Sequence, residues 1–271
     1  MGIAAATGYE GGVSRLRPLA RVVAYRDCLS VLATRCVKVR YRRSVLGVGW
    51  SLLYPLTAML VLTAVFSRVF TDLAHYPLYA IVGFLAWGFF SLSCIQAMDA
   101  LIGGATVMRK VYVPAAVFPL SAVVANFVNL LLSIALLPLV VWLIGASPGF
   151  HIGWLVFALI LLAMFTAGLS LALAALNLFF QDVRYFFDAG LLIWFYATPI
   201  VYPAEVIPEQ YAALVWLNPL HWLIVVLRAP LYGGGAPPAL AVGAAASVAV
   251  AALVVGWLIF SRLERRFHLY L

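Results

Sequence analysis

The stretch KVRYRRSVLGVGWSLLYPLTAMLVLTAVFSRVF, residues Lys38 to Phe70, decides the fold because a dense basic segment runs directly into a long apolar segment. Its arginines are costly to place in hydrocarbon, whereas Leu52 to Val65 carries no charge at all. The junction near Gly47 to Trp50 is therefore predicted to lie at a membrane surface, with the basic side facing the cytosol.

Composition assigns the chain to the membrane class. Of its 271 residues, 66% are hydrophobic and 10% are charged, whereas roughly 45–50% of residues are apolar in soluble domains. A soluble globule cannot bury that much apolar surface, so we expect an all-α integral membrane protein. The net charge of +8 does not indicate nucleic acid, because nine of the 17 basic residues precede the first apolar run. Basic residues beside a span are a topology signal and contact anionic lipids.

Residues 1–46 are predicted to form a cytosolic tail that contains an amphipathic helix. Between Pro18 and Ser44 apolar residues recur at helical spacing, with basic residues elsewhere on the helical wheel. We expect this helix to lie on the inner leaflet. Five basic residues are expected at the lipid headgroups: Arg35, Lys38, Arg40, Arg42 and Arg43. The alternative is a solvated cytosolic helix.

Residues 47–271 are predicted to form the membrane domain. A helix needs ~20 apolar residues to cover a ~30 Å hydrocarbon core. Apolar runs predict six spans, at about 49–70, 78–102, 113–144, 153–180, 186–203 and 239–260. The short piece from Pro219 to Tyr232 contains Arg228 and Pro230. Residues 203–232 are therefore interpreted as an external amphipathic or re-entrant hairpin.

The distribution of charge predicts the orientation. With six spans, nearly all lysines and arginines lie on the side of the two termini, as expected for the cytosolic side. Arg68, near the outer end of the first span, and Arg228, in the external hairpin, are the two exceptions. The sequence thus predicts a multi-pass protein with both termini in the cytosol.

Motifs for bond-making chemistry are absent from the sequence. There is no GxxxxGK[ST] loop to hold ATP phosphates, and the four histidines are scattered over loops and a tail, without the spacing of a metal site. We therefore expect passage or partner binding, with no cofactor and no metal in this chain.

Aromatic and amide side chains occur within the predicted spans. Aromatic faces can stack on the C–H faces of sugar rings, and polar groups are costly in lipid and should face a protein interior or a passage. Gln96, Asp99 and Asn129 are expected to turn inward for that reason. The candidate passage residues are Tyr54, Trp87, Phe90, Asn126, Trp194 and Tyr196. Core packing, lipid contact and helix-to-helix hydrogen bonding are the alternatives.

Five stretches resemble the type-2 ABC exporter family, and within it the polysaccharide, O-antigen and teichoic-acid export permeases. In chain order they are YRRSVLGVGWSLLYPL, RKVYVP (Arg109 to Pro114), ALNLFFQDVRYFFD (Ala175 to Asp188), ATPIVYPAEVIP and LNPLHWLIVVLRAPLYG (Leu217 to Gly233). Two features depart from the family pattern: Gln181 stands where a basic residue is usual, and Gly103 and Gly104 stand where a polar turn is common.

The resemblance implies a homodimer of permeases in a bacterial inner membrane, with two copies of a separate ATPase that binds ATP and Mg²⁺. The implied substrate is a lipid-linked glycan. A cytosolic coupling helix at 103–113 would contact the ATPase through Met108, Arg109, Lys110, Val111, Tyr112 and Pro114, with Gln181, Asp182 and Arg184 as further contacts. An export permease for a drug or simple lipid and a membrane glycosyltransferase acting on a polyprenyl phosphate are the alternatives.

Overall fold

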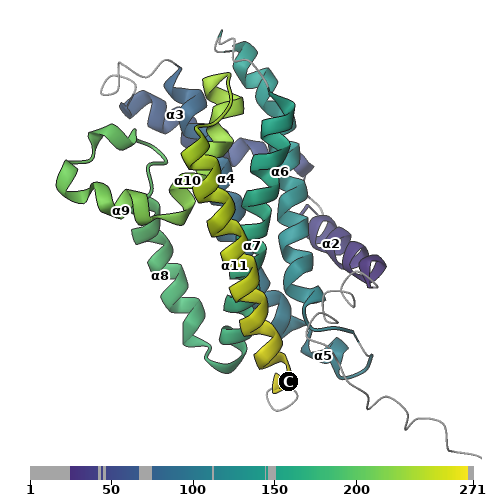
Figure 1. The fold of residues 1–271 in the computed structure, drawn as a ribbon. Helices are drawn as coiled ribbons and strands as arrows, with labels where there is room; N and C mark the ends of the chain where they lie inside the picture. The colour runs from purple at the N-terminus through teal and green to yellow at the C-terminus, as the bar shows by residue number, and fades with distance from the viewer. Residues whose placement is uncertain are drawn as a thin grey trace, which may run out of the picture.

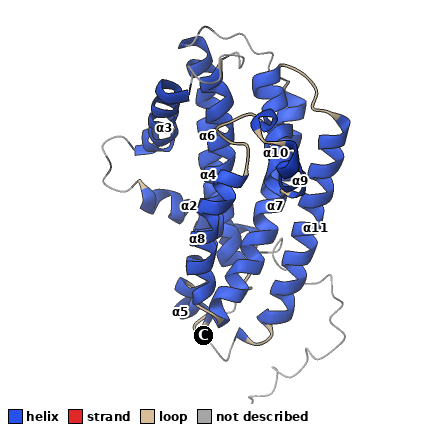
Figure 2. Cartoon of the chain, turned by 90° about the vertical axis from the view of Figure 1, so that its left-hand side faces the viewer, coloured by secondary structure: helices blue, strands red, loops and turns tan. Residues whose placement is uncertain are grey.

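The computed structural model describes residues 25–41, 44, 47–66, 75–111, 113–143, 145 and 151–267. Every regular element in these ranges is helical, as Figure 2 shows. The longer helices are α2 (Arg26–Arg40), α3 (Trp50–Phe66), α4 (Tyr76–Gly103), α6 (Val117–Leu143), α7 (Ile152–Phe179), α8 (Asp182–Ala197) and α11 (Ala239–Glu264). The shorter ones are η1 (Gly47–Gly49), α5 (Ala105–Met108), η2 (Ala204–Val206), η3 (Glu209–Tyr211), α9 (Ala212–Leu217), α10 (Pro219–Arg228) and η4 (Ala229–Gly233).

In the described ranges, four helical stretches are long and apolar enough to cross a membrane. They are α4 joined with α5, α6 alone, α7 alone and α11 alone. A further pair, α9 and α10 with their flanking turns, is bent by 84° and is either a broken fifth span or a re-entrant loop. The remaining candidates, α3 and α8, have 17 and 16 residues, fewer than the ~20 that cover a hydrocarbon core. The chain is thus a multi-pass helical membrane protein, and the count of six spans stays a prediction.

Two element boundaries differ from the sequence-based expectation. The segment expected as one helix at 103–113 is divided: Gly103 ends α4, α5 covers Ala105–Met108, and Arg109 and Lys110 form turns. Pro114 disfavours the helical conformation at Val113, the residue before it, so a helix that reaches 113 is not expected. Asp182, expected in a polar break, instead starts α8. Its carboxylate there lies near the positive end of the helix dipole.

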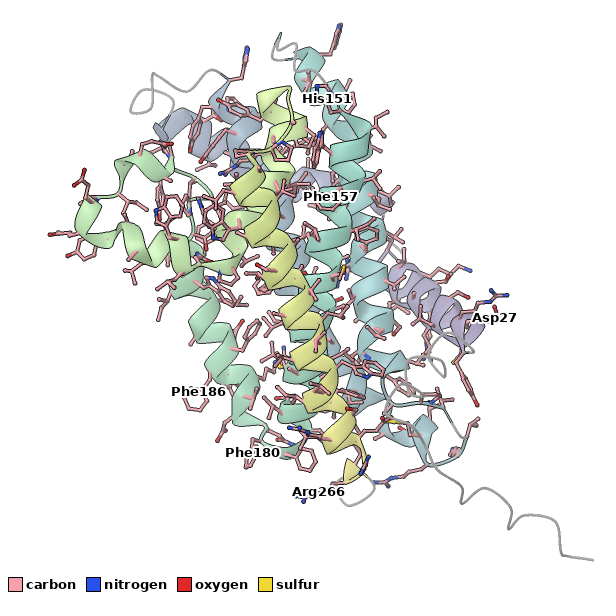
Figure 3. The ribbon with its side chains drawn as sticks, in the orientation of Figure 1. Asp27, His151, Phe157, Phe180, Phe186 and Arg266 are labelled. Carbon is pink, nitrogen blue, oxygen red and sulfur yellow. The ribbon has the colours of Figure 1, made fainter. Side chains whose placement is uncertain are left out.

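The connections divide between two ends of the bundle. In Figures 1 and 3, α5, Phe180 and Arg266 lie at one end, called here the α5 end, and His151 lies at the opposite end, called the His151 end. It follows that α4, α7 and α11 run toward the α5 end, and α6 runs away from it. The basic residues that follow α5 and α11 therefore lie at the same end, as the charge pattern predicted.

Two clusters of apolar side chains hold the bundle together. The larger one joins α4, α6, α7, α8, α10 and α11, with Phe90 and Leu162 fully buried. The smaller one lies at the α5 end, where Leu101, Phe260 and Phe267 are buried and Met108 packs against them. This second cluster fixes α5 to α4, α6, α7 and α11.

The N-terminal helices lie on one side of the bundle. Figure 2 shows α2 and α3 on the side opposite α11. There α2 packs along α6, and α3 contacts α4 and α6. This packing brings the last residues of α2 against the facing surfaces of α4 and α6, where the candidate site lies.

Candidate functional site

A cavity of about 730 Å³ opens between α2, α3, α4, α6 and α8. We call it the Arg40 cavity. Its wall combines one cation, several neutral polar side chains and a set of aromatic rings. The lining residues are Arg40, Tyr41, Trp50, Phe84, Leu85, Trp87, Gly88, Phe89, Ser91, Leu92, Gln96, Asn126, Asn129, Leu130, Ser133 and Phe195.

Arg40, the last residue of α2, lies at the polar part of this wall. Its Nη2 atom donates to Oε1 of Gln96 on α4 and to Oδ1 of Asn126 on α6, both at 2.7 Å. Asn126 in turn donates from Nδ2 to the same Gln96 oxygen at 3.1 Å. Both partners are neutral amides, and among the described residues no carboxylate pairs with this guanidinium. The positive charge of Arg40 is hydrogen-bonded but not neutralised.

A second set of polar groups continues along α6. The Tyr41 hydroxyl donates to Oδ1 of Asn129 at 3.1 Å, and Ser133 donates to the backbone oxygen of Asn129 at 3.0 Å. Asn126, Asn129 and Ser133 are spaced by three and four residues, so they share one face of the helix. Asn129 is 8% exposed, and its Nδ2 donor has no hydrogen-bond partner within the part of the chain that the structure describes. A buried donor without a partner is unusual and indicates a position where a ligand or water would bind.

The aromatic part of the wall lies toward the His151 end. The ring of Phe195, from α8, lies 5.4 Å from that of Trp87 and 5.5 Å from that of Phe84, measured between centroids. On α4, Phe84 precedes Gln96 by twelve residues, which corresponds to roughly 18 Å of helix. The Arg40 cavity is therefore elongated, with its charged end nearer the α5 end and its aromatic end farther away.

The candidate passage residues fall in different environments. Trp87 and Asn126 line the Arg40 cavity. Phe90 is fully buried in the core, 5.2 Å from the ring of Trp194. Trp194 donates to Oδ1 of Asn218 at 2.9 Å, and Tyr196 is 65% exposed on the outer face of α8. The side chain of Tyr54 lies outside the described residues.

The five basic residues expected at the lipid headgroups do not share one environment. Arg35 and Lys38 are exposed and border a shallow groove along α2. Arg40 instead faces α4 and α6, whereas Arg42 and Arg43 lie outside the described residues. Helical spacing alone does not distinguish these positions, because the contact that turns Arg40 inward is made with residues 56 and 86 positions away.

The surface at the α5 end carries the residues assigned to ATPase contact. Arg109, Lys110 and Val111 are exposed, Pro114 is half-buried, and Met108 is anchored in the second apolar cluster. Tyr112 lies outside the described residues. Gln181 and Asp182 are exposed at the start of α8, and Arg184 forms an ion pair with Asp99 at the end of α4.

Sequence reasoning missed part of this site. Phe195 and Tyr41 line the Arg40 cavity and were not assigned to the passage. For Tyr41 no local signal was available, because it follows a helix expected at the membrane surface. In the described residues no cluster of three or more His, Cys, Asp or Glu side chains is arranged to bind a metal ion.

The helices and the cavity define a multi-pass membrane protein with an internal polar and aromatic surface, as transport proteins have. Residues 28–232 match the ABC-2 type transporter family. The chain belongs to this family.

Its relatives include two O-antigen export system permease proteins RfbA. The one from Myxococcus xanthus is 32% identical over 255 residues, covering 93% of this chain and 98% of the relative. The one from Klebsiella pneumoniae is 30% identical over 246 residues, covering 89% of this chain and 93% of the relative.

Proposed function

We propose that this chain is the permease subunit of an ATP-driven exporter that moves a lipid-linked polysaccharide, such as an O-antigen, a teichoic acid or a similar envelope glycan, across a bacterial inner membrane. The observation that carries the proposal is the similarity, over most of both chains, to relatives named O-antigen export permeases. The Arg40 cavity supports it, because aromatic faces and neutral amides suit a sugar polymer, and Arg40 is the one charged residue among the described residues that line the cavity.

In the proposed topology the chain crosses the membrane six times, with both termini in the cytosol. The segment after α8 supports a fifth crossing. Residues 198–203 continue from α8 toward the start of α4, where the Tyr76 hydroxyl donates to the Val201 oxygen at 2.8 Å. Residues 182–203 together therefore extend from the α5 end to the level of the first turn of α4. The bent pair α9 and α10 is then the re-entrant hairpin on the outer side.

The proposed complex contains two copies of this chain and two copies of an ATPase, which binds ATP and Mg²⁺. The exposed basic surface of Arg109 and Lys110 is the proposed ATPase contact. Because Met108 packs into a cluster shared by four helices, a force applied to α5 would reach α4 and α6 and hence two walls of the Arg40 cavity.

The outer face of α8 exposes Phe186 and Ile193 by 77% and 73%, and Figure 3 shows Phe186 projecting away from the bundle. Lipid or a second copy would cover this face.

Charge reversal at α5 tests this proposal. In cells that lack the natural permease, the wild-type chain should restore glycan at the cell surface, and its tagged form should recover an ATPase. The double variant Arg109→Glu with Lys110→Glu should reduce ATPase recovery and surface glycan together, because both positions are exposed.

The matched control is Arg265→Glu with Arg266→Glu, two exposed basic residues at the same end of the bundle. It should retain ATPase binding and export. Equal losses of ATPase recovery and surface glycan in both double variants would mean that total charge at the α5 end matters, and not a contact made by Arg109 and Lys110. A wild-type chain that restores no surface glycan would refute the substrate assignment itself.

A further inference from the structure

We propose that the Arg40 cavity is the binding site for the phosphate or diphosphate group that joins lipid and glycan in the transported molecule. Arg40 supplies the charge and Asn129 a hydrogen-bond donor, with the first sugar against the aromatic wall. This inference rests on the proposed function and names the part of the substrate that the site recognises.

The positive charge of Arg40 is held in the cavity by neutral groups. Among the described residues, Arg26 and Arg184 each pair with a carboxylate. The buried Arg228 gives its donors to two backbone carbonyls. Arg40 differs, because it lines an open cavity and its side-chain partners within the described ranges are two amide oxygens. A guanidinium held in place by neutral acceptors, with open space beside it, is arranged for an oxyanion.

The side-chain amide of Asn129 offers a hydrogen-bond donor to the cavity. Nδ2 of Asn129 is buried and meets no acceptor among the described residues, whereas Oδ1 of the same amide accepts from the Tyr41 hydroxyl. That contact orients the amide and leaves its donor unused. Asn129 lines the same cavity as Arg40. A phosphate oxygen would accept from both groups and remove the energetic cost of the unpaired donor.

The elongated Arg40 cavity separates its charged end from its aromatic end. The phosphate site lies at its charged end, and the rings of Trp87 and Phe195 lie farther along α4 and α8. A headgroup bound at Arg40 would extend its sugar toward these rings. Trp50 also lines the cavity and is 52% exposed, so the aromatic wall continues to the surface of the chain.

Binding to the purified full chain in detergent tests the site. The probes are a long-chain polyprenyl diphosphate, phosphatidylglycerol and inorganic diphosphate, each titrated into the micellar protein. We expect Arg40→Gln to weaken polyprenyl diphosphate binding by about tenfold or more, the ratio that corresponds to roughly 1.4 kcal/mol. Asn129→Ala should weaken it by a smaller factor. Arg35→Gln, an exposed arginine on the same helix, should leave it within about twofold, since one exposed charge contributes little.

The three probes separate the possible sources of the phosphate. If phosphatidylglycerol binds as tightly as polyprenyl diphosphate, the site is a general lipid contact. If inorganic diphosphate binds as tightly as polyprenyl diphosphate, the lipid contributes nothing to recognition. Either result would overturn the proposal, as would unchanged binding in Arg40→Gln. Because Arg40 also joins α2 to the bundle, Arg40→Lys provides a variant that keeps the charge. It should bind better than Arg40→Gln, and the reverse order would also count against the proposal.

Export in cells distinguishes failure of the site from failure of the proposed function. If the wild-type chain exports glycan and Arg40→Gln exports it equally well, the site assignment is wrong and the permease function stands. If the wild-type chain exports no glycan, the proposed function fails before the site is in question.

Discussion

The guanidinium of Arg228 lies over the ring of Tyr79, with its central carbon 3.6 Å from the ring centroid. Arg228 ends α10 and is 7% exposed. Its Nη1 donates to the Pro199 oxygen at 2.8 Å and its Nη2 to the Ile200 oxygen at 2.6 Å. One side chain thus joins the hairpin, the segment after α8 and the first turns of α4.

Replacement of this arginine should destabilise the chain strongly. Arg228→Leu would leave two buried carbonyl groups without donors, at roughly 1–3 kcal/mol each. Thermal unfolding of the purified chain in detergent measures the loss, and Arg35→Leu at an exposed position is the control. Gly83→Ala should also lower the melting temperature, because a Cβ there would lie 2.6 Å from Nη2 of Arg228. A melting temperature for Arg228→Leu equal to that of the control would contradict this account.

The bend between α9 and α10 should depend on Asn218. Its Oδ1 accepts from the Leu220 backbone at 3.1 Å and from Trp194 at 2.9 Å, and its Nδ2 donates to Thr198 at 2.8 Å. Loss of a helix cap costs ~1 kcal/mol, and the buried partners add to that. We expect Asn218→Ala to lower the unfolding temperature more than Trp194→Phe, which removes one of these bonds. The opposite order would show that the bend is fixed by apolar packing instead.

The contact between α7 and α11 should tolerate no side chain at its centre. A Cβ on Gly256 would lie 1.9 Å from the Gly168 oxygen, so Gly256→Ala must push the helices apart. We expect poor yield and an aggregated elution profile for that variant. Gly243→Ala, on the same helix, is the matched control, because a Cβ at this position would meet nothing within 4 Å. It should be neutral or slightly stabilising, since alanine favours a helix over glycine by ~1 kcal/mol.

The ion pair between Arg184 and Asp99 should contribute little to stability. The two side chains are 38% and 53% exposed, and solvent-exposed pairs contribute only ~0–1 kcal/mol. Asp99→Asn should therefore unfold at nearly the wild-type temperature. If this pair also takes part in ATPase contact, the same variant would lose export at unchanged stability. A large drop in melting temperature would instead mean that the pair is shielded from solvent in the assembled protein.

The proposed topology predicts opposite labelling at two exposed positions. In a cysteine-free background, an impermeant maleimide added to cells with a permeabilised outer membrane should react at Glu209→Cys, in the hairpin. It should not react at Arg266→Cys, which lies at the α5 end (Figure 3). Membrane disruption should then expose the second position. Labelling of Arg266→Cys in intact inner membranes would refute a cytosolic C-terminal end.

The sequence predicted the apolar helices better than it predicted the site. Trp87 and Asn126 were selected because aromatic and amide groups within a span need a protein environment, and both line the Arg40 cavity. The same argument selected Phe90 and Trp194, which pack in the core instead. The pattern is identical in the two cases, since a position inside a span specifies burial in protein but not whether a cavity or a neighbouring ring fills the space.

The sequence by itself determined the membrane class, the positions of the long helices and the end of the bundle at which basic residues gather. These properties follow from hydropathy and charge summed over neighbouring residues, so local sequence contains them. Only the tertiary structure decided that Arg40 meets Gln96 and Asn126, and that Arg228 meets Pro199 and Tyr79. Each of these contacts joins separate helices or a loop, and depends on how the helices pack, because a helical period places a side chain on a face without specifying the helix that faces it.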